Sequence, residues 1–120
     1  MILIDKNNQL SSSLELITQG LNIVRVDAVA IEFMQMPRDE IYLVNQEAIG
    51  DIPEQCLNNL SHCLGIVVFY KDNFVEEWLQ KLKVIDAIHF GDIKSLLIRK
   101  KIIFWSNIEL QTLKIKSQFL

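Results

Sequence analysis

One carboxylate, Asp5, stands where this chain could carry chemistry. It ends the apolar run Met1-Ile2-Leu3-Ile4, which has the composition of a buried parallel strand. Open α/β sheets place their sites at the carboxyl ends of such strands. The next segment, Lys6-Asn7-Asn8-Gln9, contains no glycine, so larger side chains would have to cradle a phosphate, and we find no nucleophile with an adjacent base. The pattern favours a protein that is not an enzyme.

The remaining candidate metal or redox residues are two cysteines and two histidines. Cys56 and Cys63 are seven residues apart on one predicted helix, about 10 Å along its axis, which is too far for a disulfide. His62 adjoins Cys63 and His89 stands alone, so the paired spacing of a zinc site is missing. We expect two core cysteines, no metal and no cofactor.

The composition is typical of one small globular domain. Half of the 120 residues are hydrophobic and the mean hydropathy is +0.22, which predicts an apolar face left over for a partner or a second copy. No apolar run reaches the roughly 18 residues of a membrane span, and Met1 leads directly into a strand. We expect a cytoplasmic protein without membrane contact.

Charge divides the chain into an acidic body and a basic tail. Residues 1–92 carry six Lys/Arg against fourteen Asp/Glu, and residues 93–120 carry six against Glu109 alone. Lysines near a helix end complement the helix dipole, and the acidic body would repel phosphates. We therefore interpret the tail as a solvated helix face or a tether to an acidic partner, and expect no nucleic-acid binding by this domain alone.

Strands and helices are predicted to alternate five times. The strands are predicted at 2–5, 23–26, 41–44, 66–70 and 86–90, each rich in β-branched or aromatic residues. The first helix has apolar residues at helical spacing from Leu10 to Leu21, with Asn7 or Asn8 as its cap and Gly20 to end it. Asp27 caps a short helix through Met34, although alternation at Val29, Ile31 and Phe33 would also fit a strand.

The later helices show capping signals. Asp51 and Glu54 have the spacing of a capping box ahead of a helix that Gly65 ends, and Asn73 and Glu76 repeat it ahead of a helix buried through Trp78. Gly91-Asp92 turns the chain into a last helix. That helix either breaks at Trp105 or continues as one rod, longer than the diameter of a small domain.

This alternation predicts an open α/β fold, a flavodoxin-like doubly wound five-stranded parallel sheet of order 2-1-3-4-5 with an extended C-terminal helix. In layout the chain resembles a response-regulator receiver domain over residues 1–105, and residues 106–120 would form a helical extension or linker. The resemblance lies in the order and lengths of the elements, because most of the motif residues differ.

The resemblance implies where a phosphorylation site would be. Receivers carry two acidic residues after the first strand, an aspartyl nucleophile after the third, a hydroxyl residue after the fourth and a lysine after the fifth. Here Asp5 keeps the first position, Lys6 replaces the second and Asn45 replaces the nucleophile. Tyr70 or Lys71 stands at the hydroxyl position, and Gly91-Asp92 stands at the lysine. A cation at a metal position and an amide that cannot form an acyl phosphate imply a degenerate site, which leaves Asp5 as a turn or capping residue.

Three functions remain open from the sequence. The first is a pseudo-receiver, similar to the receiver-like domains at the N-terminus of some bacterial enhancer-binding transcription activators. It would act as a phosphorylation-independent interaction and dimerisation module in signal transduction or transcription regulation. The second is a small α/β subunit of a larger assembly, and the third is a flavodoxin-like ligand-binding protein.

The expected interface follows from the same resemblance, because receivers make contacts through the fourth helix, fifth strand and fifth helix. Trp78 at helical spacing is interpreted as a core residue. The candidate interface residues, which would serve a homodimer or a heteromeric protein partner, are Phe90, Ile103, Phe104 and Trp105. Trp105 is the preferred anchor, since residues 102–105 are apolar around more than half of the helix and one domain can bury only one side of it.

Overall fold

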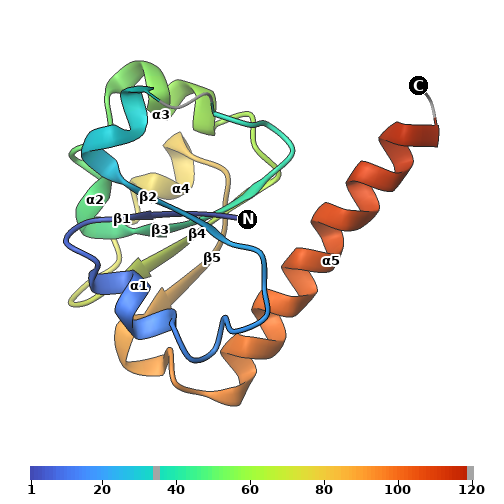
Figure 1. Cartoon of the computed structure of the whole chain (residues 1–120). Coiled ribbons are helices and arrows are strands. Elements are labelled where there is room, and N and C mark those ends of the chain that lie inside the picture. Colours follow the sequence, from blue (N-terminus) through green and yellow to red (C-terminus); the bar gives the residue numbers. More distant parts are fainter. Residues whose placement is uncertain (34–35, 119–120) are drawn as a thin grey trace.

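The centre of the molecule is a five-stranded parallel sheet of order β2-β1-β3-β4-β5 (Figure 1). The computed structural model describes residues 1–33 and 36–118. The strands are β1 (Ile2–Asp5), β2 (Val24–Asp27), β3 (Ile41–Asn45), β4 (Gly65–Tyr70) and β5 (Val84–His89). The predicted flavodoxin-like doubly wound class and strand order are confirmed.

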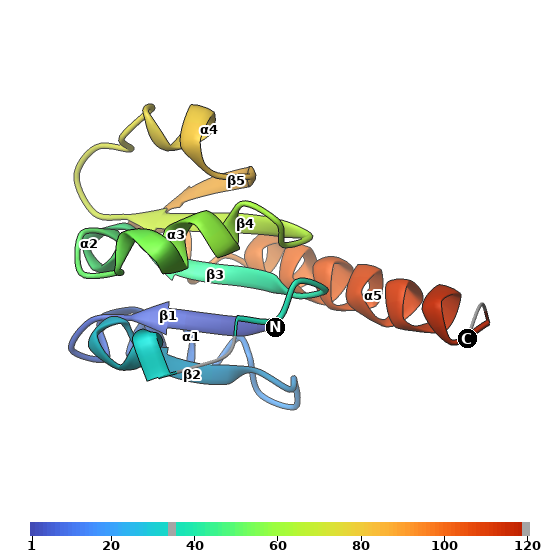
Figure 2. The same ribbon diagram turned by 90° about the horizontal axis from the view of Figure 1, so that it is seen from above.

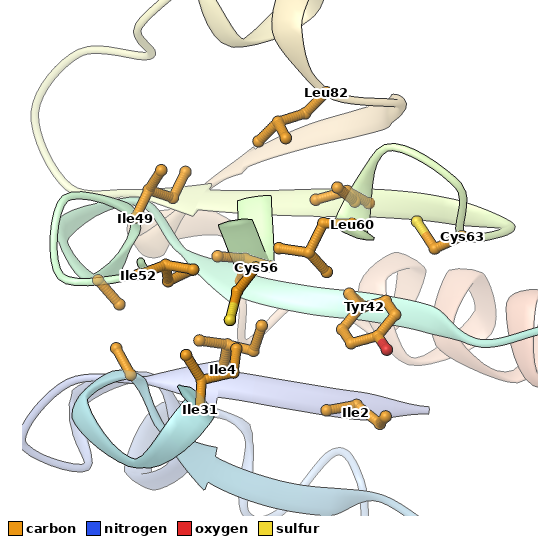
Figure 3. Close-up of a cluster of buried hydrophobic side chains, with 14 of the residues drawn as sticks. Ile2, Ile4, Ile31, Tyr42, Ile49, Ile52, Cys56, Leu60, Cys63 and Leu82 are labelled. Carbon is orange, nitrogen blue, oxygen red and sulfur yellow. The ribbon is translucent and has the colours of Figure 1, made fainter. Parts of the chain in front are cut away.

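Helices cover both faces of the sheet, because the strands alternate apolar side chains between the two faces. The first face carries η1 (Ala28–Phe33), α2 (Gln46–Ile49), α3 (Glu54–Leu60) and α4 (Trp78–Lys81). Figure 3 shows Ile31 of η1 and Cys56 of α3 packed with Ile4 of β1 in this first core cluster. The second face carries α1 (Gln9–Leu14) and α5 (Leu96–Gln118), whose side chains pack on Leu3, Leu43 and Phe69 to form the second core cluster.

Several predicted helix ends are wrong. α1 ends at Leu14, and the chain then reaches Gly20 (φ +80°) through turns from which Ile17 and Leu21 still pack on the second cluster. Apolar residues at helical spacing can thus be buried without a helix. The predicted helix after Asp27 is a 3₁₀ helix, and Met34 lies outside the described residues.

The predicted capping boxes are also wrong. α3 has Pro53 at its N-cap and α4 has Glu77, and neither makes a side-chain capping hydrogen bond. α3 ends at Leu60, and Gly65 begins β4 instead of ending the helix. The turn α2 was not predicted, and β5 begins two residues earlier than expected. In these places tertiary packing overrides short capping signals.

The last helix, α5, is one continuous rod of 23 residues, about 35 Å long. The boundary expected after residue 105, between the domain and its C-terminal extension, falls inside α5. Figure 2 shows α5 running on past the amino-terminal edge of the sheet. A short 3₁₀ turn, η2 (Phe90–Asp92), joins β5 to the segment before this helix. Among the described residues, no helix is both long and apolar enough to cross a membrane.

Candidate functional site

The carboxylate of Asp5 lies at the carboxyl edge of the sheet and is almost fully buried. Its Oδ1 accepts hydrogen bonds from the backbone N–H of Lys6 (2.7 Å) and Leu10 (3.1 Å) and from Asn45 Nδ2 (3.1 Å). Its Oδ2 accepts one from the backbone N–H of Ser11 (2.7 Å). Four donors from the chain itself therefore surround the carboxylate that ends β1.

The turn after β1 explains this arrangement. Asn7 and Asn8 adopt left-handed φ angles of 54° and 56°, which asparagine tolerates better than most residues. The turn brings the first N–H groups of α1 back onto Asp5, where an anion is favoured by the helix dipole. Asn8 is the N-cap residue of α1, as predicted, but its side chain makes no capping hydrogen bond. The predicted structural role of Asp5, as a turn or capping residue, is confirmed.

The electrostatics of Asp5 follow from its partners. Burial alone would raise the pKa of the Asp5 carboxyl, but the hydrogen bonds from Ser11, Asn45, Leu10 and Lys6 outweigh burial and hold the pKa below its ordinary value of 3.8. The carboxylate is ionised at neutral pH.

Asn45 occupies the predicted position of the nucleophile, and both ends of its amide are in use. The parallel register pairs Ile4 with Val44, which sets Asn45 beside Asp5. Its Nδ2 donates to Asp5, and its Oδ1 accepts from the backbone N–H of Glu47 at 3.1 Å and so caps α2. Asn45 is fully buried. The residue therefore joins two strands and starts a helix turn.

Two lysines lie over the same edge. Lys6 Nζ pairs with Asp51 Oδ2 at 3.0 Å, and that carboxylate raises the pKa of Lys6. Lys71 Nζ donates to Gln9 Oε1 at 2.9 Å and lies 5.6 Å from the centre of the Phe90 ring. The cations are held by local partners, so a divalent cation entering here would meet positive charge.

The other predicted site residues lie farther along the edge. The Tyr70 ring packs edge-on against His89 with 5.4 Å between ring centres, and His89 Nδ1 accepts from the backbone N–H of Gly91. Asp92 is exposed at the end of η2 and takes no part in the hydrogen bonds that link Asp5 to Asn45. The structure thus brings Asp5, Lys6 and Asn45 together and leaves Tyr70 and Asp92 outside that network.

The space beside Asp5 limits what could bind. The cavity that reaches this residue has a volume of about 80 Å³ and is lined also by Arg25 and Asp27. Cofactor pockets usually measure about 300 to 1,000 Å³. In the described part of the chain, no group of three or more His, Cys, Asp or Glu side chains could hold a metal ion. The cavity beside Asp5 is large enough for water and is smaller than a usual cofactor pocket.

The predicted interface anchor is wrong. Trp105 is only 6% exposed and packs in the second core cluster, because α5 turns it toward the sheet with Ile98 and Ile102. Phe104 is 62% exposed, so it is the exposed aromatic at this point of the helix. Ile103 and Phe90 are half-buried. Trp78 is half-buried against the first cluster, in line with its predicted core role.

A buried acidic cluster at the opposite edge of the sheet was not predicted. Glu109 Oε2 accepts from the backbone N–H of Ile41 at 3.0 Å, and its Oε1 lies 3.0 Å from the Met1 ammonium, which also pairs with Glu40. Burial and the Glu40 carboxyl raise the pKa of Glu109 to about 7. A signal did exist, because Glu109 is the sole acidic residue of the basic tail and shares helical spacing with Ile98, Ile102 and Trp105.

No family model, no curated protein and no solved structure gives a significant match to the chain.

Proposed function

We propose that this protein is a pseudo-receiver, a phosphorylation-independent interaction and dimerisation module of bacterial signal transduction or transcription regulation in the cytoplasm. One observation carries the proposal. The sheet edge that would hold a metal and a phosphate in a receiver is closed by contacts within the chain. Asp5 is saturated by four donors, Lys6 is paired with Asp51, and Asn45 stands at the nucleophile position.

The apolar surface supports an interaction role. Large hydrophobic side chains are more than half exposed on α5, including Leu97, Phe104 and Ile115. Isolated exposed apolar residues are normal, but several along one helix mark a contact surface. The same surface supports the second candidate, a subunit of a larger assembly. The small cavity beside Asp5 disfavours the third, a flavodoxin-like binding protein.

The proposal can be tested in two steps. Magnesium and beryllofluoride are first added to the unaltered chain, and the missing acidic residues are then restored by substitution. We expect neither magnesium nor beryllofluoride to shift the amide resonances around Asp5 in the unaltered chain. The double variant Lys6→Asp/Asn45→Asp places three carboxylates together, so magnesium should raise its melting temperature by relieving their repulsion.

A matched control separates a specific site from a general effect of charge. Lys83→Asp/Asn59→Asp makes the same charge change at two exposed positions, and magnesium should leave its melting temperature unchanged. Magnesium-dependent shifts centred on Asp5 in the unaltered chain would contradict the closed site. A restored variant that responds no more than the control would contradict the receiver-like geometry.

A further inference from the structure

One side of α5 carries an apolar stripe that its own domain leaves largely exposed. We call Leu97, Phe104, Ile108 and Ile115 the outer stripe. Leu97, Phe104 and Ile115 are 59%, 62% and 56% exposed, whereas Ile108 is half-buried and packs in part against the second core cluster. At about 100° per residue they fall within about 40° of one another, and about 110° around the helix from the buried stripe of Ile98, Ile102, Trp105 and Glu109. The two stripes therefore lie on different sides of the helix, and Ile108, which also contacts the second core cluster, lies at the border between them.

The spacing of the outer stripe is the same in both directions along the helix. Its members are separated by seven, four and seven residues, so the pattern is symmetric about residue 106. Two copies that cross antiparallel at that point place Leu97 opposite the partner's Ile115, and Phe104 opposite the partner's Ile108. One surface then serves both copies, as a two-fold dimer requires.

Charge selects the antiparallel arrangement. In a parallel pair, Lys100 and Lys101 would face the same residues of the partner, at a cost in repulsion. In the antiparallel pair, Lys100 lies opposite the partner's Thr112 and Lys101 opposite the partner's Gln111. Lys101 is in addition neutralised by Asp86 at 2.9 Å. The helix dipoles also oppose each other in the antiparallel pair, which is favourable.

The projecting end of α5 makes this pairing accessible. Beyond Glu109, which holds the helix to the start of β3, α5 continues past the sheet (Figure 2). Residues 110–116 of one copy would lie along residues 96–102 of the other. Four side chains from each copy form a contact at or below the lower end of stable interfaces, about 1,200 Å², so the dissociation constant should be in the micromolar range.

We infer that the partner of the outer stripe is a second copy of this chain, bound antiparallel through α5 about a two-fold axis near residue 106. This inference rests on the proposed interaction role and specifies its surface. It differs from the surface predicted from the sequence in leaving out Trp105, which packs in the second core cluster, and Ile103 and Phe90, which are half-buried.

Sedimentation equilibrium tests the dimer. The unaltered chain should associate reversibly, and Phe104→Asp should raise the dissociation constant at least about tenfold by placing a carboxylate in the stripe. The matched control is Leu96→Asp, a leucine 69% exposed about 100° around the helix from the stripe, which should change the constant less than about twofold. Circular dichroism confirms that both variants are folded.

Cross-linking tests the orientation. With a short bis-maleimide, a mixture of Leu97→Cys and Ile115→Cys chains should form covalent dimers. Leu97→Cys alone should not, because the two residues 97 would be about 27 Å apart in the antiparallel pair. The unaltered chain, whose Cys56 and Cys63 are buried, is the control for background reaction.

Three results would overturn the inference: a monomer at several hundred micromolar, an unchanged constant in Phe104→Asp, or efficient cross-linking of Leu97→Cys to itself. If the natural partner of the outer stripe were a helix of another protein, this chain would stay monomeric, which is the first of these results. None of them would reopen the site at Asp5, which the magnesium experiment tests separately.

Discussion

Replacing Asp5 by alanine should strongly destabilise the fold, which distinguishes a structural anion from a metal ligand. A carboxylate kept free for a cation strains the empty protein, so its removal costs little or even stabilises. Asp5 instead accepts from two N–H groups of α1 and from the buried Asn45 amide. Losing such a helix cap costs about 1 kcal/mol, and up to about 2.

The stranded Asn45 amide adds to that cost. A buried donor left without an acceptor costs about 1 to 3 kcal/mol. Water can enter the cavity of about 80 Å³ beside Asp5 and recover part of this loss. We therefore expect Asp5→Ala to lower the free energy of unfolding by about 2 to 4 kcal/mol. Urea unfolding followed by circular dichroism would measure the change.

Asp27→Ala is the matched control. Asp27 also ends a strand and accepts from the backbone N–H of Val29 at 3.1 Å, but it is exposed, so its loss should cost less than about 1 kcal/mol. Asp5→Asn should lower the free energy of unfolding nearly as much as Asp5→Ala does, because the NH₂ group of the new asparagine would face backbone N–H groups that need an acceptor. A loss below 1 kcal/mol in Asp5→Ala, or a gain, would refute the capping role.

Three further predictions follow from the rest of the structure. Trp105→Ala should lower the free energy of unfolding by about 3 to 5 kcal/mol and leave the sedimentation behaviour of the folded protein unchanged. A variant whose dimer dissociates while its folding stability is kept would contradict the core position of Trp105. Glu109 has a pKa of about 7 in the folded protein, above the ordinary 4.5, so its contribution to stability is present below pH 4.5 and is lost as the pH rises through 7. Glu109→Gln should therefore reduce the pH dependence of the melting temperature between pH 5 and 7.5, and an equal slope in both proteins would assign that dependence to other groups. No oligonucleotide should bind with micromolar affinity near 150 mM salt, because Arg99, Lys101 and Lys116 already contact Ile17, Asp86 and Asp39; fluorescence anisotropy with a steep salt dependence would show the opposite.

The apolar runs of the sequence were sufficient to predict the sheet. A strand buried on both faces needs apolar side chains in succession, and Ile66 to Phe69 meet that need without reference to any other segment. Alternation with helical segments then limits the topology, since crossovers between parallel strands are short and right-handed. Asp5 could be interpreted as a capping residue for the same reason, because its partners Leu10 and Ser11 are close to it in the chain.

What the sequence could not decide depends on distant contacts. Residues 102–105 are apolar on nearly every side, and only the position of the sheet determines that Trp105 is buried and Phe104 is exposed. Asn45 begins α2 and bonds to Asp5, a residue 40 positions away, while Glu109 meets Ile41 across 68 positions. Helical spacing describes one segment at a time. Which face of that segment is covered, and which polar group finds a partner, is decided when segments distant in the chain pack together.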